Sequence, residues 1–235
     1  MREGLDDFQE NLKEMLSKYL KISRKEIENR IELNPDKSVK DWNELGMEKF
    51  YKETDVYLYG LIDYSNWDRL ENIMFPLSKW TKNRILDYGG GIGAISFPLG
   101  QHNKVYYYDL PSKTQDFAKY LAKRLNIKIK FIEQEESVWK NEYDCIICVD
   151  VLEHLKKPMD TVRKITKHLK PGQLFLTSGF DFTYGDDTPM HLIENLFYKD
   201  EYNKYMDDNY HLMYFIRGKR EIIYMFAKKG EKDGR

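Results

Sequence analysis

Ile85-Leu86-Asp87-Tyr88-Gly89-Gly90-Gly91-Ile92-Gly93-Ala94 is a short apolar run that ends in a glycine-rich turn. An apolar run of this length is typical of a buried β-strand, and a helical stretch follows the glycines. Glycine in such a turn lets a ligand approach backbone N–H groups at the start of a helix. The stretch therefore predicts a strand, a turn and a helix that together bind a nucleotide or a nucleoside.

From Arg84 onward, short apolar runs alternate with helical stretches. Further strands are expected at residues 104–109, 127–132, 143–149 and 174–177, with helices at 113–125, 159–169 and 192–206. Strands that alternate with helices form a parallel sheet covered on both faces. The runs 212–216 and 222–227 flank Arg217-Gly218-Lys219 and predict a hairpin, which brings one antiparallel strand into the sheet.

The first 80 residues differ in character and are expected to be helical. Apolar residues at helical spacing predict a helix over residues 4–20, and Ser23 followed by Glu26 is a capping box that starts a second helix. Asn34-Pro35 is expected to stop that second helix. Aromatic residues then crowd the stretch up to Trp80, which indicates either ordinary helix packing or a lid that lends aromatic walls to a ligand site.

The chain is therefore divided into three parts. Residues 1–80 form a helical cap or lid, residues 81–230 form the α/β domain, and residues 231–235 form a polar, frayed tail.

Composition narrows the class of protein. The 235 residues include 38 Lys and Arg against 39 Asp and Glu, which gives a net charge of −1. A near-neutral chain has no net positive potential that would attract nucleic acid or an anionic membrane. A small molecule is therefore the expected partner. No apolar run approaches the roughly 20 residues of a bilayer span, and no signal peptide is recognised. A cytoplasmic protein without membrane contact is expected.

Cys145 and Cys148 form a CxxC pair, a spacing also found in redox and zinc sites. Both lie in the apolar run 143–149, where residues three apart point to opposite faces of a strand. They are expected to be two small buried residues rather than a reactive pair.

The glycine-rich turn alone leaves two kinds of cofactor open. Gly89, Gly91 and Ala94 also satisfy the GxGxxG/A pattern of dinucleotide-binding domains. Asp109, at the end of the second strand, lies at the distance where that pattern places an acid on the ribose. An NAD-dependent oxidoreductase is therefore one alternative.

Three further features resemble the class I S-adenosylmethionine-dependent methyltransferases. They are Asp87 two residues before the first glycine, the run 143–155 that ends in Asp150-Val151-Leu152-Glu153-His154-Leu155, and Leu169-Lys170-Pro171-Gly172 before a strand. The resemblance covers residues 84 to 228. It implies a Rossmann-like, doubly wound, seven-stranded α/β sheet, mostly parallel with a C-terminal antiparallel hairpin, preceded by the N-terminal helical lid.

The resemblance also implies a cofactor, S-adenosyl-L-methionine, which leaves as S-adenosyl-L-homocysteine. Asp87, Gly89, Gly91 and Gly93 are expected around its methionine part, with Asp109 on the ribose and Asp150 at the end of the fourth strand. Where relatives usually carry a Gly-Asp pair beside the adenine, this chain has Ile132-Glu133-Gln134-Glu135-Glu136-Ser137. Glu135 is the expected contact of the adenine amine.

Asp150, Glu153 and His154 are spaced i, i+3, i+4. If a helix begins there, all three project from one face at the carboxyl end of the sheet, where open α/β folds bind ligands. Beyond the fifth strand, Asp186-Asp187-Thr188-Pro189-Met190-His191-Leu192 could bring His191 to the same place. The pattern is similar to the metal site of small-RNA 2′-O-methyltransferases and has relatives among ubiquinone-pathway O-methyltransferases.

Three roles stay open for these residues. Asp150, Glu153, His154 and His191 form a mixed carboxylate and imidazole set that would hold Mg, Mn, Fe or Zn and lower the pKa of a substrate hydroxyl. Alternatively, His154 or His191, with Glu153 beside them, is the catalytic base, because neutral imidazole accepts a proton near pH 7. In the simplest interpretation, the acids and histidines only line the pocket or cap a helix.

The patterns and the resemblance together predict an enzyme that transfers a methyl group from S-adenosylmethionine to a small-molecule acceptor. The expected nucleophile is an oxygen atom, helped by a histidine base or a metal-assisted hydroxyl. An RNA 2′-hydroxyl or a protein is an alternative acceptor. A non-catalytic S-adenosylmethionine-binding protein and an NAD-dependent oxidoreductase are more remote alternatives. The oligomeric state is not predicted.

Overall fold

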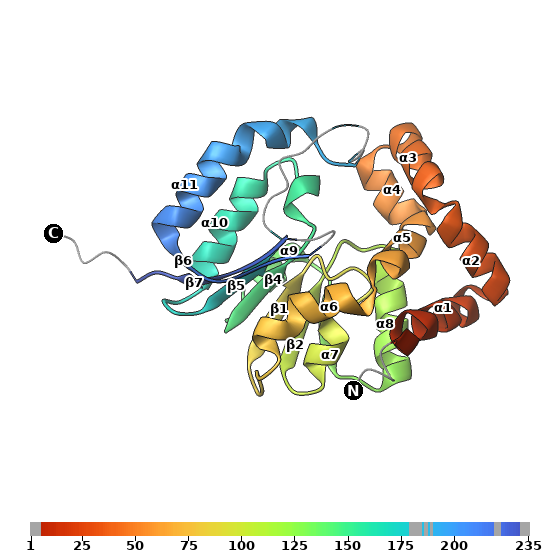
Figure 1. Ribbon diagram of the computed structural model, residues 1–235, viewed down its shortest axis with the longest axis horizontal. Coiled ribbons are helices and arrows are strands. Elements are labelled where there is room, and N and C mark those ends of the chain that lie inside the picture. The colour runs from red at the N-terminus through yellow and green to blue at the C-terminus, as the bar shows by residue number, and fades with distance from the viewer. Residues whose placement is uncertain (1–5, 179–184, 186–187, 189, 219–221, 231–235) are drawn as a thin grey trace.

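The computed structural model describes residues 6–178, 185, 188, 190–218 and 222–230, and these form one seven-stranded sheet with helices on both faces (Figure 1). In spatial order the strands are β3 (Ile129–Ile132), β2 (Lys104–Tyr108), β1 (Arg84–Tyr88), β4 (Cys145–Cys148), β5 (Leu174–Thr177), β7 (Ile222–Lys228) and β6 (Tyr210–Arg217). The strands β1 to β5 pair in parallel, whereas β7 is antiparallel to both of its neighbours. The predicted doubly wound sheet with a C-terminal hairpin is confirmed.

The sheet is buried on both faces because its strands send alternate side chains into two cores. The helices α9 (Glu135–Val138), α10 (Pro158–His168) and α11 (Lys199–Asn209) cover one face, and α6 (Trp67–Met74), α7 (Ser96–Gly100) and α8 (Lys113–Leu125) cover the other. Leu86 and Ile146 pack with Val162 of α10, whereas Ile85 and Ile147 pack toward α6. Continuous apolar strands of this kind are typical of a parallel sheet.

The N-terminal helices share a core with the helices that cover the sheet. They are α1 (Asp6–Leu20), α2 (Arg24–Glu32), α3 (Asn34–Leu45), α4 (Met47–Glu53) and α5 (Val56–Tyr64), an arc that runs along α8 (Figure 1). Leu16 and Leu58 join Phe117 and Leu121 of α8 in one hydrophobic cluster. Short helices are marginal alone, so this shared contact holds the arc in place. The segment η1 (Phe75–Leu77) then leads from α6 into the sheet.

The helix α2 begins and ends at residues that the sequence indicated. Ser23 caps α2, and its hydroxyl oxygen accepts a hydrogen bond from the Glu26 N–H at 3.1 Å, as predicted. Asn34-Pro35 follows the end of α2, but it also starts α3 at once. Proline is tolerated in the first turn of a helix, because the N–H that it lacks has no partner there. The prediction of a simple stop was therefore incomplete.

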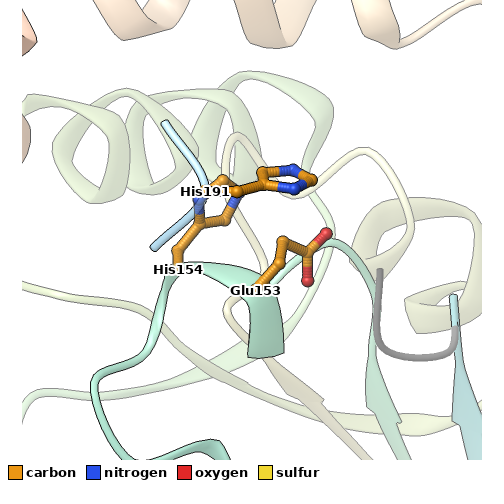
Figure 2. A group of neighbouring side chains, drawn as sticks. All are labelled: Glu153, His154 and His191. Atoms are coloured by element: carbon orange, nitrogen blue, oxygen red, sulfur yellow. The ribbon is translucent and has the colours of Figure 1, made fainter. Parts of the chain in front are cut away.

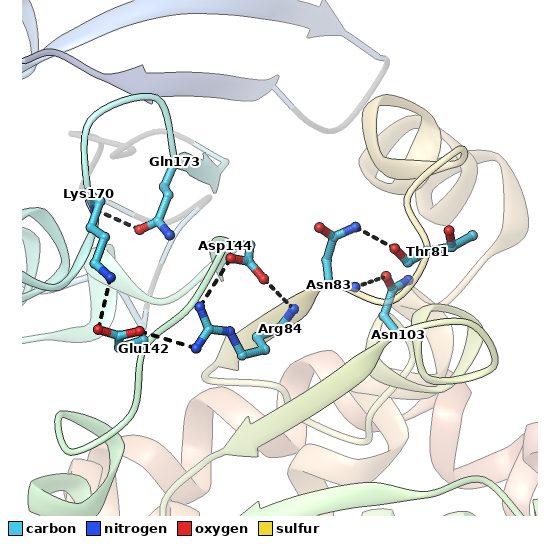
Figure 3. A network of polar contacts seen from close by, with 8 residues as sticks. All are labelled: Thr81, Asn83, Arg84, Asn103, Glu142, Asp144, Lys170 and Gln173. Atoms are coloured by element: carbon cyan, nitrogen blue, oxygen red, sulfur yellow. Dashed lines mark hydrogen bonds and ion pairs between the residues drawn. The ribbon is translucent and has the colours of Figure 1, made fainter.

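At the amino ends of the strands, a polar network joins β1, β4 and β5 (Figure 3). The Arg84 N–H donates to Asp144 Oδ2 at 2.7 Å, and the Arg84 guanidinium contacts Asp144 and Glu142 at 3.4 and 3.3 Å. Lys170, ahead of β5, pairs with Glu142 at 2.9 Å. This network fixes the sheet edge that lies opposite the glycine-rich turn.

Cys145 and Cys148 occupy the two opposite cores of the sheet, and both are buried free thiols. Burial raises the pKa of each thiol. They are two small core residues, as predicted.

The C-terminal part begins with η3 (Ile193–Tyr198) and α11, where one helix was expected. The hairpin pairs Tyr210 with Lys228 and Arg217 with Ile222. Lys219 of the predicted turn and the predicted tail, residues 231–235, lie outside the described residues. Among the helices that the structure describes, none is long and apolar enough to cross a membrane.

Candidate functional site

The glycine-rich turn between β1 and α7 forms a backbone cradle at the carboxyl edge of the sheet. Gly89, Gly91 and Gly93 have φ angles of +75°, +56° and +82°, a region that residues with a side chain rarely adopt. A Cβ atom at Gly89 would lie 2.3 Å from Val151 Cγ2. The hydroxyl of Tyr107 donates to the Gly91 carbonyl and ties the turn to β2. Larger residues are therefore excluded where a ligand approaches the backbone.

Asp87 lies beneath this turn. Its side chain is buried, and its Oδ2 accepts a hydrogen bond from Ser96 Oγ of α7 at 2.7 Å. A Cβ atom at Gly90 would lie 3.0 Å from the same oxygen. Burial raises the pKa of Asp87 to about 6. Asp87 thus joins the end of β1 to α7 and supports the turn from below.

Asp109 follows β2 and faces the glycine-rich turn from the side. Its Oδ2 accepts from the Gly91 N–H at 2.7 Å, and its Oδ1 accepts from the Leu110 N–H at 2.6 Å. Burial raises the pKa of Asp109 to about 6, although both hydrogen bonds oppose the rise. Each carboxylate oxygen has a second lone pair, so Asp109 can still accept hydrogen bonds from a ligand.

Glu135, the expected adenine contact, begins α9 beyond β3. Its Oε1 lies 2.9 Å from the Lys164 ammonium group and 3.3 Å from both the Tyr88 hydroxyl and Trp139 Nε1. One oxygen of this carboxylate is therefore held by protein groups, and Oε2 is the atom that a ligand could engage.

The expected helix face at the end of β4 does not form. Asp150 has a φ of +54°, and its N–H donates to Ser178 Oγ at 2.8 Å. The following turn, η2 (Leu152–His154), is a short 3-10 helix, which has three residues per turn. The prediction that Asp150 shares an α-helical face with Glu153 and His154 is therefore wrong. The Asp150 carboxylate instead pairs with Arg69 of α6.

Glu153, His154 and His191 do come together at the end of β4 (Figure 2). One potential ligand atom from each residue lies within 4.8 Å of the others, and Asp150 does not belong to this cluster in the described structure. Glu153 is buried, with 5% of its surface exposed, and the two imidazole rings are 5.4 Å apart and nearly perpendicular. The predicted approach of His191, from beyond β5, thus occurs.

The protonation state of His154 follows from its surroundings. Nδ1 lies 3.1 Å from the carbonyl oxygen of Met190, and a carbonyl can only accept, so Nδ1 carries the proton. Burial and, to a smaller extent, the nearby His191 lower the pKa of His154 to about 4, although the hydrogen bond with Met190 and the charge of Asp150 oppose the change. His154 is therefore neutral near pH 7, and its Nε2 holds a lone pair that can take a proton or bind a metal.

The segment that delivers His191 is tied to η2 through its backbone. The Leu192 N–H donates to the Glu153 carbonyl at 3.2 Å, and Asn195 Nδ2 donates to the same oxygen. These bonds hold His191 beside His154. Asp186, Asp187 and Pro189 of the predicted 186–192 stretch lie outside the described residues.

Sequence reasoning missed individual residues that α6 and the N-terminal arc bring to this edge. Arg69 reaches Asp150 from α6, three residues after the helix cap Asn66. Tyr51 and Tyr57 were part of a noted aromatic stretch, but no spacing distinguished them from their neighbours. Only the fold, which lays the arc against the sheet, could identify them.

Residues 62–219 match the sequence model of a family described as "Methyltransferase domain". The chain belongs to this methyltransferase domain family. The matched segment includes the glycine-rich turn, Asp109 and the Glu153, His154 and His191 cluster. This result favours the methyltransferase interpretation over the dinucleotide-binding one.

The methyltransferase domain is similar in sequence to several ubiquinone biosynthesis O-methyltransferases. It is 31% identical to the protein of that name from Rickettsia akari over 133 residues, which are 53% of each chain. It is 28% identical to the one from Bordetella avium over 109 residues, 44% of this chain and 45% of the relative. The chain spans about half the length of the curated relatives it matches.

Solved structures share the fold of the methyltransferase domain at low sequence identity. Magnesium protoporphyrin IX methyltransferase from Synechocystis PCC 6803 with bound S-adenosylmethionine has a TM-score of 0.56 at 15% identity, over 83% of this chain and 97% of that one. An N-methyltransferase from Bradyrhizobium japonicum in complex with S-adenosyl-L-homocysteine has a TM-score of 0.52 at 14% identity, over 70% and 87%. Both confirm the Rossmann-like architecture.

Proposed function

We propose that this methyltransferase domain transfers a methyl group from S-adenosyl-L-methionine to an oxygen atom of a small-molecule acceptor. The observation that carries the proposal is a neutral histidine, His154, at the same sheet edge as the glycine-rich turn and Asp109. The cofactor is supported by solved neighbours that hold S-adenosylmethionine or its product. The oxygen acceptor is supported by the curated O-methyltransferase relatives.

The described residues fit this cofactor. Asp109 accepts hydrogen bonds from the ribose hydroxyls, and Glu135 Oε2 accepts from the adenine amine. The Arg69 guanidinium binds the carboxylate of the methionine part, while Asp150 attracts its ammonium group. Gly89, Gly91 and Gly93, supported by Asp87, leave the backbone open to the ligand. When bound, the cofactor supplies an electrophilic methyl group on a positively charged sulfur.

The chain's own residues then have three tasks in a displacement at this methyl group. They hold the acceptor oxygen in line, exclude water, and take up the hydroxyl proton. We assign the proton to His154 Nε2, because Nδ1 is already protonated and bound to the Met190 carbonyl. The Glu153 carboxylate lies beside the imidazole and stabilises the positive charge that forms there. His191 lies beside His154 and lines the site that the acceptor would occupy.

The Glu153, His154 and His191 cluster also supports a second role, the binding of a divalent metal ion. Two imidazoles and one carboxylate suit Zn, Fe or Mn, and the contact of His154 Nδ1 with a carbonyl is typical of a metal-ligating histidine. Such an ion would lower the pKa of the acceptor hydroxyl. Asp150, which pairs with Arg69, is not assigned to this ligand set.

The acceptor class is proposed from charge and from the relatives. The net charge of −1 offers no attraction for RNA, which disfavours a 2′-hydroxyl of a polynucleotide. The curated relatives are named for ubiquinone biosynthesis, which supports a small-molecule acceptor.

The proposal is tested with S-adenosylmethionine labelled in its methyl group and a panel of hydroxylated, amino and thiol acceptors. We expect label on an acceptor oxygen. Activity that persists after dialysis against EDTA supports His154 as the base that takes up the hydroxyl proton. Activity that is lost and returns only when a divalent ion is added supports metal binding by the Glu153, His154 and His191 cluster. Label transferred only to nitrogen or sulfur would contradict the proposed oxygen acceptor.

A further inference from the structure

The strand β6 forms one edge of the sheet (Figure 1). Among the strands that the structure describes, it pairs only with β7. A strand at the edge of a sheet presents a row of backbone N–H and C=O groups that can pair with a further strand. Because β6 is eight residues long, its outer side offers a long template for such pairing.

The exposed side chains of β6 are mainly apolar. Leu212, Met213 and Phe215 have 55%, 59% and 50% of their surface exposed. No charged residue and no proline lies between His211 and Arg217. Contiguous apolar side chains on a protein surface typically mark an interaction site.

The opposite edge of the sheet, β3, is protected against strand pairing. This strand has only four residues. Lys130 lies within it, Lys128 and Glu133 flank it, and all three are exposed. Short strands and lysine side chains are the usual protection of a sheet edge. The fold therefore guards one edge and leaves apolar side chains on the other, which indicates that β6 is a binding surface.

Met213 is an extra residue in β6. The register of pairing with β7 shifts between Leu212 and Tyr214, which is a β-bulge. A bulge bends the strand and increases its twist. Regular pairing continues on both sides of it, over residues 210–212 and 214–217. The bulge therefore bends β6 without removing its outer edge.

The two ends of β6 carry charges of opposite sign. Asp207 and Asp208, both exposed, lie in the last turn of α11 just before the strand, and Arg217, also exposed, ends the strand. Lys228 and Lys229 lie near the acidic end, but both ammonium groups donate to backbone carbonyls, that of Lys229 to Asp207. The two carboxylates thus stay exposed at one end and the guanidinium at the other.

We infer that β6 pairs antiparallel with β6 of a second copy of this chain and joins the two sheets across a two-fold axis. Antiparallel pairing brings Arg217 of each copy toward Asp207 and Asp208 of the other. Parallel pairing would place like charges together. The dimer is closed, because the pairing uses the β6 edge of both copies and β3 is guarded. The inference does not depend on the proposed methyl transfer.

The sequence of β6 is nearly symmetric in its chemistry about Tyr214. With the two-fold axis near this residue, Leu212 of one copy lies near Ile216 of the other, and Met213 lies near Phe215. Apolar side chains then meet along the whole central part of the strand. The same surface that is exposed in one chain is thereby covered in the dimer.

The first test measures the mass of the protein by analytical ultracentrifugation from about 1 to 200 μM. We expect a dimer with a dissociation constant of about 10 μM or tighter. Leu212→Lys and Met213→Lys should each raise this constant at least about tenfold, because a charge enters an apolar contact. Leu33→Lys, at an apolar residue between α2 and α3 that is 65% exposed, is the matched control and should not change it. Circular dichroism melts check that all three variants are folded.

The second test exchanges the charges at the two ends of the strand. Arg217→Glu alone and Asp208→Arg alone should each raise the dimer dissociation constant roughly 3- to 10-fold, because like charges then meet at both ends. The double variant restores opposite charges and should return to within about threefold of wild type.

The third test locates the axis. Cys145 and Cys148 are buried, so a cysteine introduced on β6 is the accessible thiol. Tyr214→Cys should form an intermolecular disulfide with oxidised glutathione, because the two copies of a residue at the axis lie opposite each other. His211→Cys should not, because its two copies would be about 20 Å apart.

Several results would overturn the inference. A chain that stays monomeric up to about 200 μM would leave the edge to a strand of another protein. A dimer that Leu212→Lys and Met213→Lys do not weaken would lie elsewhere on the surface. Growth beyond the dimer would exclude a closed two-fold contact. Loss of affinity that the exchanged charges do not restore, or a Tyr214→Cys dimer without a disulfide, would contradict the antiparallel pairing.

Discussion

His154 shows how burial can prepare a single residue for proton transfer. The ring is neutral near pH 7 because burial lowers its pKa to about 4, and the Met190 carbonyl leaves Nε2 as the only acceptor nitrogen. A base with a pKa of about 4 is lost only when the pH falls through that value. Asp109, with a pKa of about 6, loses its negative charge at a higher pH. The two groups therefore predict different pH profiles.

We expect kcat at saturating cofactor to stay level from pH 8 down to about 5 and then to fall, while kcat/KM for S-adenosylmethionine falls already below about pH 6. Stopped assays across this range separate the two curves.

His154→Ala should lower kcat by about 10²- to 10⁴-fold and leave S-adenosyl-L-homocysteine affinity unchanged. His102→Ala, at an exposed site before β2, is the control. Full activity of His154→Ala would remove it as the base.

Asp109 is expected to contribute to cofactor affinity through charged hydrogen bonds. Asp109→Ala removes the acceptor of the ribose hydroxyls, and it also frees the Gly91 and Leu110 N–H groups. Hydrogen bonds to a charged group contribute about 1.5–3 kcal/mol. Their loss should increase the dissociation constant of S-adenosyl-L-homocysteine roughly 10- to 100-fold. Isothermal titration with S-adenosyl-L-homocysteine measures the change. An unchanged affinity would contradict the ribose assignment.

The buried carboxylate of Asp87 should make the free energy of unfolding depend on pH. Its folded-state pKa of about 6 lies above its ordinary value of 3.8, so the folded protein binds the proton more tightly than the unfolded chain. The wild-type free energy of unfolding should therefore decrease as the pH rises from about 4 to 6 and then stay constant.

Asp87→Asn removes this cost of ionisation. We expect its free energy of unfolding to exceed that of wild type by about 1–3 kcal/mol at pH 7.5, and the difference to vanish near pH 4. Urea denaturation at several pH values measures both. A variant that is less stable than wild type at pH 7.5 would show that the hydrogen bond from Ser96 outweighs the burial of charge.

At the scale of elements, the amino ends of β1, β4 and β5 offer a matched pair of substitutions. Asp144 accepts from the Arg84 backbone N–H, whereas the contacts of Glu142 with Arg84 and Lys170 are exposed ion pairs. Asp144→Ala leaves a backbone donor without its partner and should reduce the free energy of unfolding by about 1–2 kcal/mol. Glu142→Ala should reduce the free energy of unfolding much less, because solvent screens exposed ion pairs. Equal losses in thermal denaturation would contradict this ranking.

The same scale shows which elements could be predicted from sequence. The strands were predictable because runs such as residues 145–149 are apolar throughout and lie between polar residues, here Asp144 and Asp150. The turn after β4 was not, because the spacing of Asp150, Glu153 and His154 fits an α-helix equally well. The deciding factor is the positive φ of Asp150, which the Ser178 hydroxyl and Arg69 stabilise from distant parts of the chain.

At the scale of the whole molecule, the site is assembled from three regions that no local pattern connects. The glycine-rich turn and Asp109 were predictable, because each ends a strand at one edge of a parallel sheet. The approach of His191 was also predictable as a candidate. The contribution of the N-terminal helices was not, since Arg69 reaches the edge from α6 and Tyr57 lies on α5, which packs on α8.

The methyl-donor site is tested most directly by a calorimetric titration of the metal-stripped protein with S-adenosyl-L-homocysteine and, separately, with NADH. We expect one binding site for S-adenosyl-L-homocysteine with a dissociation constant of about 1–100 μM or tighter, and no heat from NADH. Absence of S-adenosyl-L-homocysteine binding, repeated with Mg, Mn and Zn added, or tighter binding of NADH, would contradict the claim that the glycine-rich turn and Asp109 form a methyl-donor site.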